Sequence, residues 1–294
     1  FFFILRLTPK KAKKMEQSID TFLSLDPSAY LRKFTTSNVR PDSRPLHTVR
    51  PTTVVPTILP RNTHGSSLIR IGNTQIISAI TLTIGQPSPS LPSNGELDVS
   101  VNFSPICGKR YNIHGRISHN EEGSGSGRAV TSAAANASDP QVIESFVKRT
   151  VLGSGIVDLT DLCLEEGKSA WKLHISCVVV NHDGNVVDAV LLGCVAALQD
   201  LKLPATKFIS SSDSQEDGRV QIILPESEET ENCLGRRQLT LKMIPVPLTI
   251  GMFEGKLLVD PTMVEEAVCD GMITVVVDAL TLGNDNGDNS NTAV

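Results

Sequence analysis

Alternation of apolar and polar residues predicts a series of strands in the first part of the chain. Over residues 96–103 the side chains of Leu97, Val99, Val101 and Phe103 occupy every second position, which is the pattern of a strand with one buried face. The Gly72-Asn73 pair between two apolar stretches predicts a tight hairpin turn. Further strands are predicted over residues 52–59, 67–71, 75–84 and 172–180.

Apolar residues at helical spacing predict two longer helices. Asp139 can cap the first helix, and Pro140 suits its first position because the missing N–H is not needed there. The predicted buried side of this helix consists of Ile143, Phe146, Val147, Thr150 and Val151. The second helix, over residues 186–201, is largely apolar and contains small residues that let other elements pack closely against it.

A second, smaller unit is predicted towards the C-terminus. A strand over residues 239–250 contains Pro245 and Pro247, which lack a backbone N–H and therefore predict a sheet edge or a bulge. Asp260-Pro261 predicts the start of a helix that continues to about residue 270, and an apolar run then predicts a closing strand. This succession of strands and helices predicts an α+β fold in two similar lobes.

The predicted domain organisation has five parts. They are an N-terminal extension with a short helix (1–38), a first domain (39–209), an acidic linker (210–235), a second domain (236–283) and a disordered polar tail (284–294). The chain begins with Phe, and Met15 follows a basic run. We therefore expect residues 1–14 to be translated upstream sequence.

Composition and charge exclude several classes of function. The chain has 27 basic and 32 acidic residues, a net charge of −5, so it cannot bind nucleic acid through its overall charge. Aromatic residues make up 4%, which argues against platforms that stack bases. No apolar run is long enough to predict a membrane span.

The cysteines and histidines predict neither a metal site nor a disulfide framework. The 6 cysteines and 6 histidines are scattered and lack the spacing of metal ligands. Cys177 and Cys194 lie in apolar runs and are predicted to be buried and reduced. We therefore expect a reducing, intracellular compartment and no cofactor.

Several motifs together resemble those of the RNase PH family. They are Arg40-Pro41-Asp42-Ser43-Arg44-Pro45, residues 65–74 (GSSLIRIGNT), Asp183-Gly184-Asn185, Ile244-Pro245-Val246-Pro247 and Val259-Asp260-Pro261. The resemblance runs from about residue 26 to residue 282. It implies the RNase PH-like fold, with two lobes of mixed sheet and packed helices, of which the first is similar to ribosomal protein S5 domain 2.

The resemblance also implies that the catalytic machinery of the family has been lost. Catalytic members phosphorolyse RNA from its 3′ end, which needs cations that hold phosphate and carboxylates for a metal or acid role. The family's Gly-Glu-Arg-Thr phosphate motif falls at about residues 169–172, where Trp171 takes the place of the arginine. Val178 takes the place of the carboxylate that partners Asp183. We therefore predict no catalytic residues, with Trp171, Val178, Asp183 and Asp188 as degenerate active-site positions.

Each of these positions also has a purely structural interpretation. Asp183 suits a turn, Asp188 suits a helix cap, and Trp171 suits packing in the core or at an interface. The residues Arg40, Asp42 and Arg44 are predicted to form a local ion-pair network at the entry to the first strand.

The candidate RNA contacts are basic residues of one irregular segment and of the helix that follows it. They are Lys109, Arg110, Arg116, Arg128, Lys148 and Arg149. Arg149 also matches one arginine of the family. Such cations ordinarily form a solvated surface, but in a ring with a central pore they would line the path of the RNA.

The resemblance implies a non-catalytic subunit of the RNA exosome ring, which supports 3′–5′ RNA processing and degradation, including maturation of ribosomal RNA. Its expected partners are other RNase PH-like ring subunits, S1/KH cap subunits and RNA, without a membrane, in the nucleus, nucleolus and cytoplasm. Two alternatives remain. One is an active phosphate-dependent 3′–5′ exoribonuclease of the RNase PH type that uses Asp183, and the other is an assembly protein that never touches RNA. Apolar residues 273–277 and the strand around Pro245 are expected to leave a surface that only a partner covers.

Overall fold

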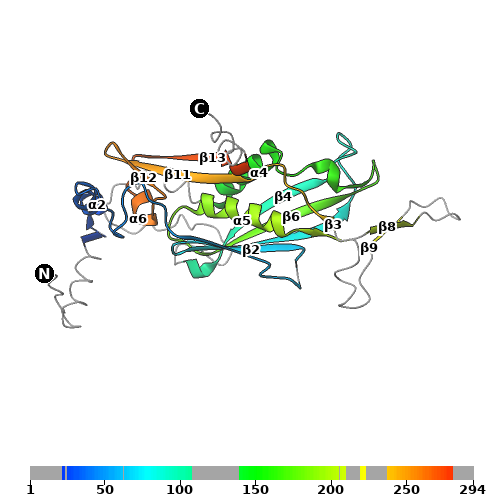
Figure 1. Ribbon diagram of the computed structural model, residues 1–294, viewed down its shortest axis with the longest axis horizontal. Coiled ribbons are helices and arrows are strands. Elements are labelled where there is room, and N and C mark those ends of the chain that lie inside the picture. The colour runs from blue at the N-terminus through cyan, green and yellow to red at the C-terminus, as the bar shows by residue number, and fades with distance from the viewer. Residues whose placement is uncertain are drawn as a thin grey trace, which may run out of the picture.

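One mixed sheet forms the largest part of the computed structural model (Figure 1), which describes residues 22–23, 25–61, 63–107, 139–204, 206–209, 219–222 and 237–280. Strand β4 runs parallel to β6, and the other pairs of this six-stranded sheet are antiparallel. The order is β1 (Thr52–Pro56), β2 (Gly65–Ile71), β3 (Thr74–Gly85), β6 (Ser169–Asn181) and β4 (Glu96–Phe103), with β5 (Cys163–Glu165) beside β6.

The strands follow the alternation in the sequence. In β4 the side chains of Leu97, Val99, Val101 and Phe103 are all buried, as the pattern predicts. The predicted hairpin joins β2 to β3, with Gly72 at a positive φ of 55° between the paired residues Ile71 and Thr74. Strand β1 is shorter than predicted: it ends at Pro56, whereas the sequence pattern predicts a strand to residue 59.

Two helices pack on the buried face of this sheet. Helix α4 (Pro140–Ser154) is capped by Asp139, whose carboxylate accepts the backbone N–H of Gln141 at 3.0 Å. It buries Ile143, Val147 and Val151 in the main core. Helix α5 (Val186–Asp200) approaches the sheet so closely that a Cβ on Gly193 would lie 2.4 Å from the Ser78 Oγ. Packing at this distance requires the small residues that the sequence places there.

The two cysteines predicted to be buried and reduced lie at the contact between β6 and α5. Cys177 and Cys194 are both free and fully buried, with their Sγ atoms 3.4 Å apart.

A three-stranded antiparallel sheet forms the second unit, in the order β12 (Lys256–Val259), β11 (Pro245–Phe253) and β13 (Gly271–Asp278). Helix α5 packs against β11 on one side and against β2 and β3 on the other, so it lies between the two sheets (Figure 1). The predicted strand over residues 239–250 is wrong at its start. Gln238 ends a short strand that pairs with Lys202, and β11 begins only at Pro245.

Strand β11 lies between β12 and β13 in the sheet, but the half of β11 that contains its two prolines pairs only with β13. Pro245 and Pro247 pair with Asp278 and Val276 of β13. Strand β12 pairs with β11 only from Ile250 to Phe253. Their missing N–H groups therefore fall where no ladder to β12 is formed, and the predicted edge is correct for this half of the strand.

The helix predicted from Asp260-Pro261 to about residue 270 is wrong in both its start and its length. Helix α6 spans only Met263–Glu266, and its cap is Thr262, which forms a capping box with Glu265. Asp260 lies before the helix at a positive φ of 54° and is buried. Its carboxylate is used for ion pairs, so it does not cap a helix.

The N-terminal helix packs on the second unit. Helix α2 (Pro27–Thr35) begins directly after its cap, Asp26. Its Leu31 is fully buried in a small cluster with Leu46, Phe253 and Leu258. The remaining elements are η1 (Pro105–Cys107), η2 (Leu159–Leu162), β7 (Lys202–Leu203) with β10 (Arg237–Gln238), and β8 (Thr206–Ile209) with β9 (Arg219–Ile222).

Candidate functional site

Charged and polar side chains converge where the turn from β6 to α5 meets the second unit. At the centre the Arg50 guanidinium donates to both carboxylate oxygens of Asp260, from Nε at 2.9 Å and from Nη2 at 2.8 Å. The same guanidinium donates to the backbone carbonyls of Asp183 at 2.6 Å and Gly184 at 3.3 Å. Arg50 is 5% exposed and Asp260 2%, so this is a buried, bidentate ion pair.

Asn185 and Asp188 extend this group of contacts into α5. We call the residues Arg50, Asp183, Asn185, Asp188 and Asp260 the Arg50 cluster. The Asn185 Nδ2 donates to Asp260 at 2.7 Å and to Asp188 at 2.8 Å. The Asp188 carboxylate also accepts the backbone N–H of Thr249 at 2.8 Å and its hydroxyl at 2.6 Å. The interpretation of Asp188 as a helix cap is wrong, because Asn185 holds the cap position and Asp188 lies in the first turn. Asp188 instead ties α5 to β11.

A second buried arginine lies beside this cluster. The Arg40 Nε donates to Glu265 at 2.9 Å, and its Nη2 donates to the other oxygen of Glu265 and to the Asp260 carbonyl. The prediction of a local network of Arg40, Asp42 and Arg44 is wrong for Arg40, which reaches across to α6. Arg44 pairs with Asp42 as predicted, and it also pairs with Asp260 at 3.3 Å.

The pKa values of the carboxyls in this region shift in opposite directions, although burial acts on all of them in the same way. The Glu266 carboxylate accepts the Asn185 backbone N–H at 2.6 Å, yet desolvation raises its pKa to about 7. Desolvation likewise raises the pKa of Asp188. For Asp260 desolvation acts in the same direction, but the hydrogen bonds and charge of Arg50 outweigh it and lower its pKa.

The four degenerate active-site positions do not converge. Trp171 is buried in the main core, whereas Val178 is 36% exposed on the opposite face of β6. Seven residues of an extended strand separate them by roughly 23 Å. Asp183 lies in the turn after β6, where its carboxylate accepts the Asn73 side chain at 3.1 Å and lies 3.8 Å from Arg50.

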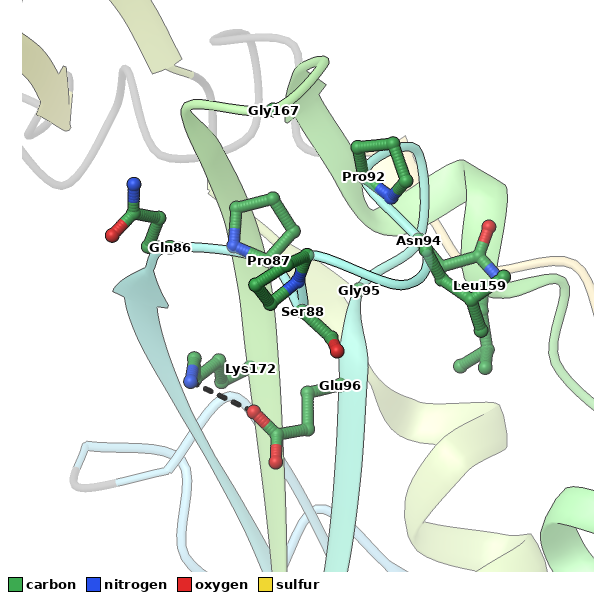
Figure 2. Close-up of a pocket in the computed structure, with 12 residues that line it drawn as sticks. Gln86, Pro87, Ser88, Pro92, Asn94, Gly95, Glu96, Leu159, Gly167 and Lys172 are labelled. Carbon is green, nitrogen blue, oxygen red and sulfur yellow. Dashed lines mark ion pairs between the residues drawn. The ribbon is translucent and has the colours of Figure 1, made fainter.

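A surface pocket lies at the start of β6, beside the positions that match the family's phosphate motif (Figure 2). It is lined by Lys172 and Glu96, by Leu159 and Gly167, and by the proline-rich segment between β3 and β4. Of the described residues around it, Lys172 is the one cation, and its Nζ pairs with Glu96 at 2.7 Å. The charge that could attract a phosphate is thus already neutralised by a carboxylate.

The candidate RNA contacts divide into two groups. Lys109, Arg110, Arg116 and Arg128 lie outside the described residues. On α4, Arg149 is exposed, whereas Lys148 pairs with Asp98 at 2.7 Å. The hydrogen bond between them raises the pKa of Lys148 and lowers that of Asp98.

Two further features concern ligands and membranes. Within the described ranges, no group of three His, Cys, Asp or Glu side chains is placed to hold a metal ion. The helices of the described part of the chain are too short or too polar to cross a membrane.

The sequence motifs contain most of the Arg50 cluster, but sequence reasoning missed its role. Arg50 follows the arginine-rich motif by only a few residues, and Asp260 was interpreted as a helix start. Glu265 and Glu266 had no separate signal, because acidic residues in the first turn of a helix are ordinarily exposed. The one signal in the sequence that could have pointed to this cluster is a pair of motifs rich in charged residues and proline, residues 40–45 in the first lobe and residues 259–261 in the second.

The fold defines an α+β protein in which helix α5 lies between a six-stranded and a three-stranded sheet, and the family models identify its class. The model of 3′ exoribonuclease family domain 1 (RNase PH) matches residues 48–204, and that of domain 2 matches residues 243–290. The chain therefore belongs to the RNase PH family of 3′ exoribonucleases, as the motifs predict.

Relatives and solved structures are similar over most of the chain. The exosome complex component Rrp42 of Thermococcus onnurineus is 32% identical over 214 residues, which are 73% of this chain and 66% of the relative. That of Methanopyrus kandleri is 29% identical over 238 residues, 81% of this chain and 75% of the relative. A structure described as the Archaeoglobus fulgidus exosome with RNA bound to the active site has a TM-score of 0.65 at 23% identity, covering 89% of this chain and 84% of that chain. Rice Rrp46 has a TM-score of 0.51 at 18% identity, covering 82% of both chains.

The first prediction concerns the ion pair at the centre of the Arg50 cluster. Asp260→Asn should lower the free energy of unfolding by about 3–5 kcal/mol, because it removes the carboxylate that the buried Arg50 contacts through two hydrogen bonds and leaves only the more distant Asp183 carboxylate at 3.8 Å. Glu96→Gln, which breaks the exposed pair with Lys172, should cost at most about 1 kcal/mol. Urea denaturation of both variants tests this, and equal small losses would contradict it.

The second prediction concerns Glu266 and pH. Its pKa is higher in the folded chain than in the unfolded chain, so unfolding releases a proton between about pH 4.5 and pH 7, and stability falls as the pH rises through that range. Glu266→Gln removes this dependence. The variant should therefore gain up to about 3 kcal/mol relative to the wild type between pH 5 and pH 7.5. Denaturation of both proteins at several pH values measures the difference, and an equal dependence on pH in the wild type and in Glu266→Gln would contradict the prediction.

Proposed function

We propose that this chain is a non-catalytic ring subunit of an RNA exosome. The observation that supports this most directly is the state of the positions that match the family's phosphate motif. Trp171 is buried in the core, and Lys172 is paired with Glu96. Neither offers the arginine fork that holds a free phosphate in line with the last phosphodiester.

The assembly part of the proposal rests on the relatives. Those named above are called exosome complex components, and the chains of similar fold include one from an archaeal exosome core. We infer that this chain pairs with other RNase PH-type ring subunits and S1/KH cap subunits. The motifs of the sequence also resemble those of the eukaryotic ribosomal RNA-processing protein 43 type. The proposal therefore includes 3′–5′ processing of ribosomal RNA and other RNAs, in the nucleus, nucleolus and cytoplasm, with other subunits supplying the nuclease.

The third prediction tests catalysis by this chain. With a labelled single-stranded oligonucleotide and inorganic phosphate, the purified chain should release no nucleoside diphosphate, while an active RNase PH assayed in parallel does. Because the Asp183 carboxylate already accepts a hydrogen bond from the Asn73 side chain, Asp183→Ala should leave the amount of released nucleoside diphosphate unchanged. Phosphate-dependent release that Asp183→Ala abolishes would establish the alternative, an active exoribonuclease.

The fourth prediction tests contact with RNA in the assembled complex. Replacing Lys109, Arg110, Arg116 and Arg128 with Ala should weaken RNA binding about equally for different sequences. Each lost phosphate contact should also reduce the slope of log affinity against log salt by roughly 0.7. The control variant replaces Arg32, Lys33, Lys168 and Lys242 with Ala, which changes the net charge by the same amount. Three of these four residues, Arg32, Lys168 and Lys242, are ion-paired.

The control should leave both affinity and salt slope unchanged. If both variants bind RNA like the wild type in an intact complex, the four cations that the first variant removes do not contact RNA. That result would support the assembly protein that never touches RNA.

A further inference from the structure

A proline-rich segment joins β3 to β4 and borders the surface pocket. Residues 86–92 contain three prolines, which lack the backbone N–H that a sheet ladder needs, and the segment forms no strand. Pro87 is buried, whereas residues 88–92 are all exposed. The segment is therefore anchored at Pro87 and accessible to other molecules after it.

Ser88 begins a tight turn in this segment. The backbone N–H of Leu91 donates to the Ser88 carbonyl at 3.0 Å, which places Ser88 at the first position of the turn and Pro89 at the second. Serine and proline are favoured at these two positions. Among the residues that the structure describes, none forms a hydrogen bond with the Ser88 hydroxyl. An exposed and unengaged hydroxyl thus directly precedes a proline.

This arrangement is that of a substrate for a protein kinase that reads proline after the acceptor residue. Two other pairs of this kind occur in the sequence, Ser104-Pro105 and Thr8-Pro9. Ser104 is only partly exposed, its Oγ accepts the Ile106 backbone N–H at 3.4 Å, and Pro105 begins the 3-10 helix η1. Thr8-Pro9 lies outside the described residues. Of the two described pairs, Ser88-Pro89 is the one that presents an open hydroxyl.

The pocket beside Ser88 contains a cation that is placed to hold a phosphate. Ser88, Glu96 and Lys172 line this pocket (Figure 2), whose volume of about 560 Å³ leaves room for a phosphate group. The Lys172 Nζ pairs with Glu96 at 2.7 Å, and the two side chains are 39% and 63% exposed. An ion pair this exposed contributes little to stability. Lys172 therefore exchanges Glu96 for a more highly charged partner at little cost.

We propose that Ser88 is a phosphorylation site of a proline-directed protein kinase, and that Lys172 holds the resulting phosphate. The Ser88 Oγ forms a bond to the γ-phosphorus of ATP, the bond from that phosphorus to its bridging oxygen breaks, and ADP leaves with the electron pair. The hydroxyl proton passes to the catalytic aspartate of the kinase. The product carries about −1.5 to −2 charges at pH 7, so it displaces the singly charged Glu96 from Lys172. This contact ties the proline-rich segment to the start of β6.

The first test incubates the full chain with a proline-directed kinase and ATP and maps the phosphate by mass spectrometry of its peptides. Ser88→Ala should abolish phosphate on the peptide that contains position 88. Pro89→Ala should slow phosphorylation of Ser88 at least about tenfold, because the kinase loses the side chain that it reads. The matched control, Pro105→Ala, should leave that rate unchanged. Because Pro89 is exposed, the circular dichroism spectrum of Pro89→Ala should match that of the wild type.

The second test measures the role of Lys172 by phosphorus NMR on chains that carry phosphoserine at position 88. A nearby cation favours the more highly charged form and lowers the second pKa of a phosphate. This pKa should therefore be higher in Lys172→Gln than in the wild type. Lys148→Gln is the matched control, because Lys148 is 44% exposed and pairs with Asp98 of the same strand as Glu96, but does not line the pocket. It should leave the pKa at the wild-type value.

Three outcomes would overturn the proposal. Equal rates of phosphorylation of Ser88 in the wild type and Pro89→Ala would exclude recognition through the proline. Phosphate found only on Ser104 or Thr8 would place the site elsewhere. A phosphoserine pKa that is the same in the wild type and Lys172→Gln would show that Lys172 does not hold the phosphate. Phosphate on Ser88 of the chain purified from its own cells, with phosphatases inhibited, would support the proposal.

Discussion

Two buried arginines determine how the two units of this protein fit together. A guanidinium cannot lose its proton under conditions in which proteins fold, so Arg40 and Arg50 must be matched by carboxylates wherever they are buried. Both arginines belong to the segment before β1, and their partners Glu265 and Asp260 belong to the second unit. The segment can therefore be buried only when the C-terminal sheet is docked.

The small second unit depends on this docking. Among the described residues its own buried cluster consists of Leu31 of α2, Leu46, Phe253 and Leu258, with Val268 and Cys269 partly buried beside them. This is too little apolar burial to stabilise a sheet of this size alone. Its remaining support comes from α5 and from the hydrogen bonds of Asp188 to Thr249. The N-terminal helix, the C-terminal sheet and the turn after β6 are thus parts of one packed unit, although they are far apart in the sequence.

The same arrangement explains why acidic residues that match family motifs need not act as catalysts. Asp188 and Asp260 have their oxygens occupied by Thr249, Asn185 and Arg50. Carboxylates with these internal partners hold the segment before β1, helix α5 and the second unit together. The surface pocket near Lys172 likewise has its charge balanced by Glu96 (Figure 2).

The sequence by itself determined the family and most of the local structure. The alternation in β4, the hairpin at Gly72-Asn73 and the capped helix after Asp139 were predictable because their causes lie within a few residues. Only the tertiary structure decided what the charged residues do. Asp260 resembled a helix cap, and Arg40 and Arg44 resembled a local network, because sequence patterns report neighbours along the chain. The energies of these groups depend on burial and on partners more than 200 residues away, and a one-dimensional pattern contains neither.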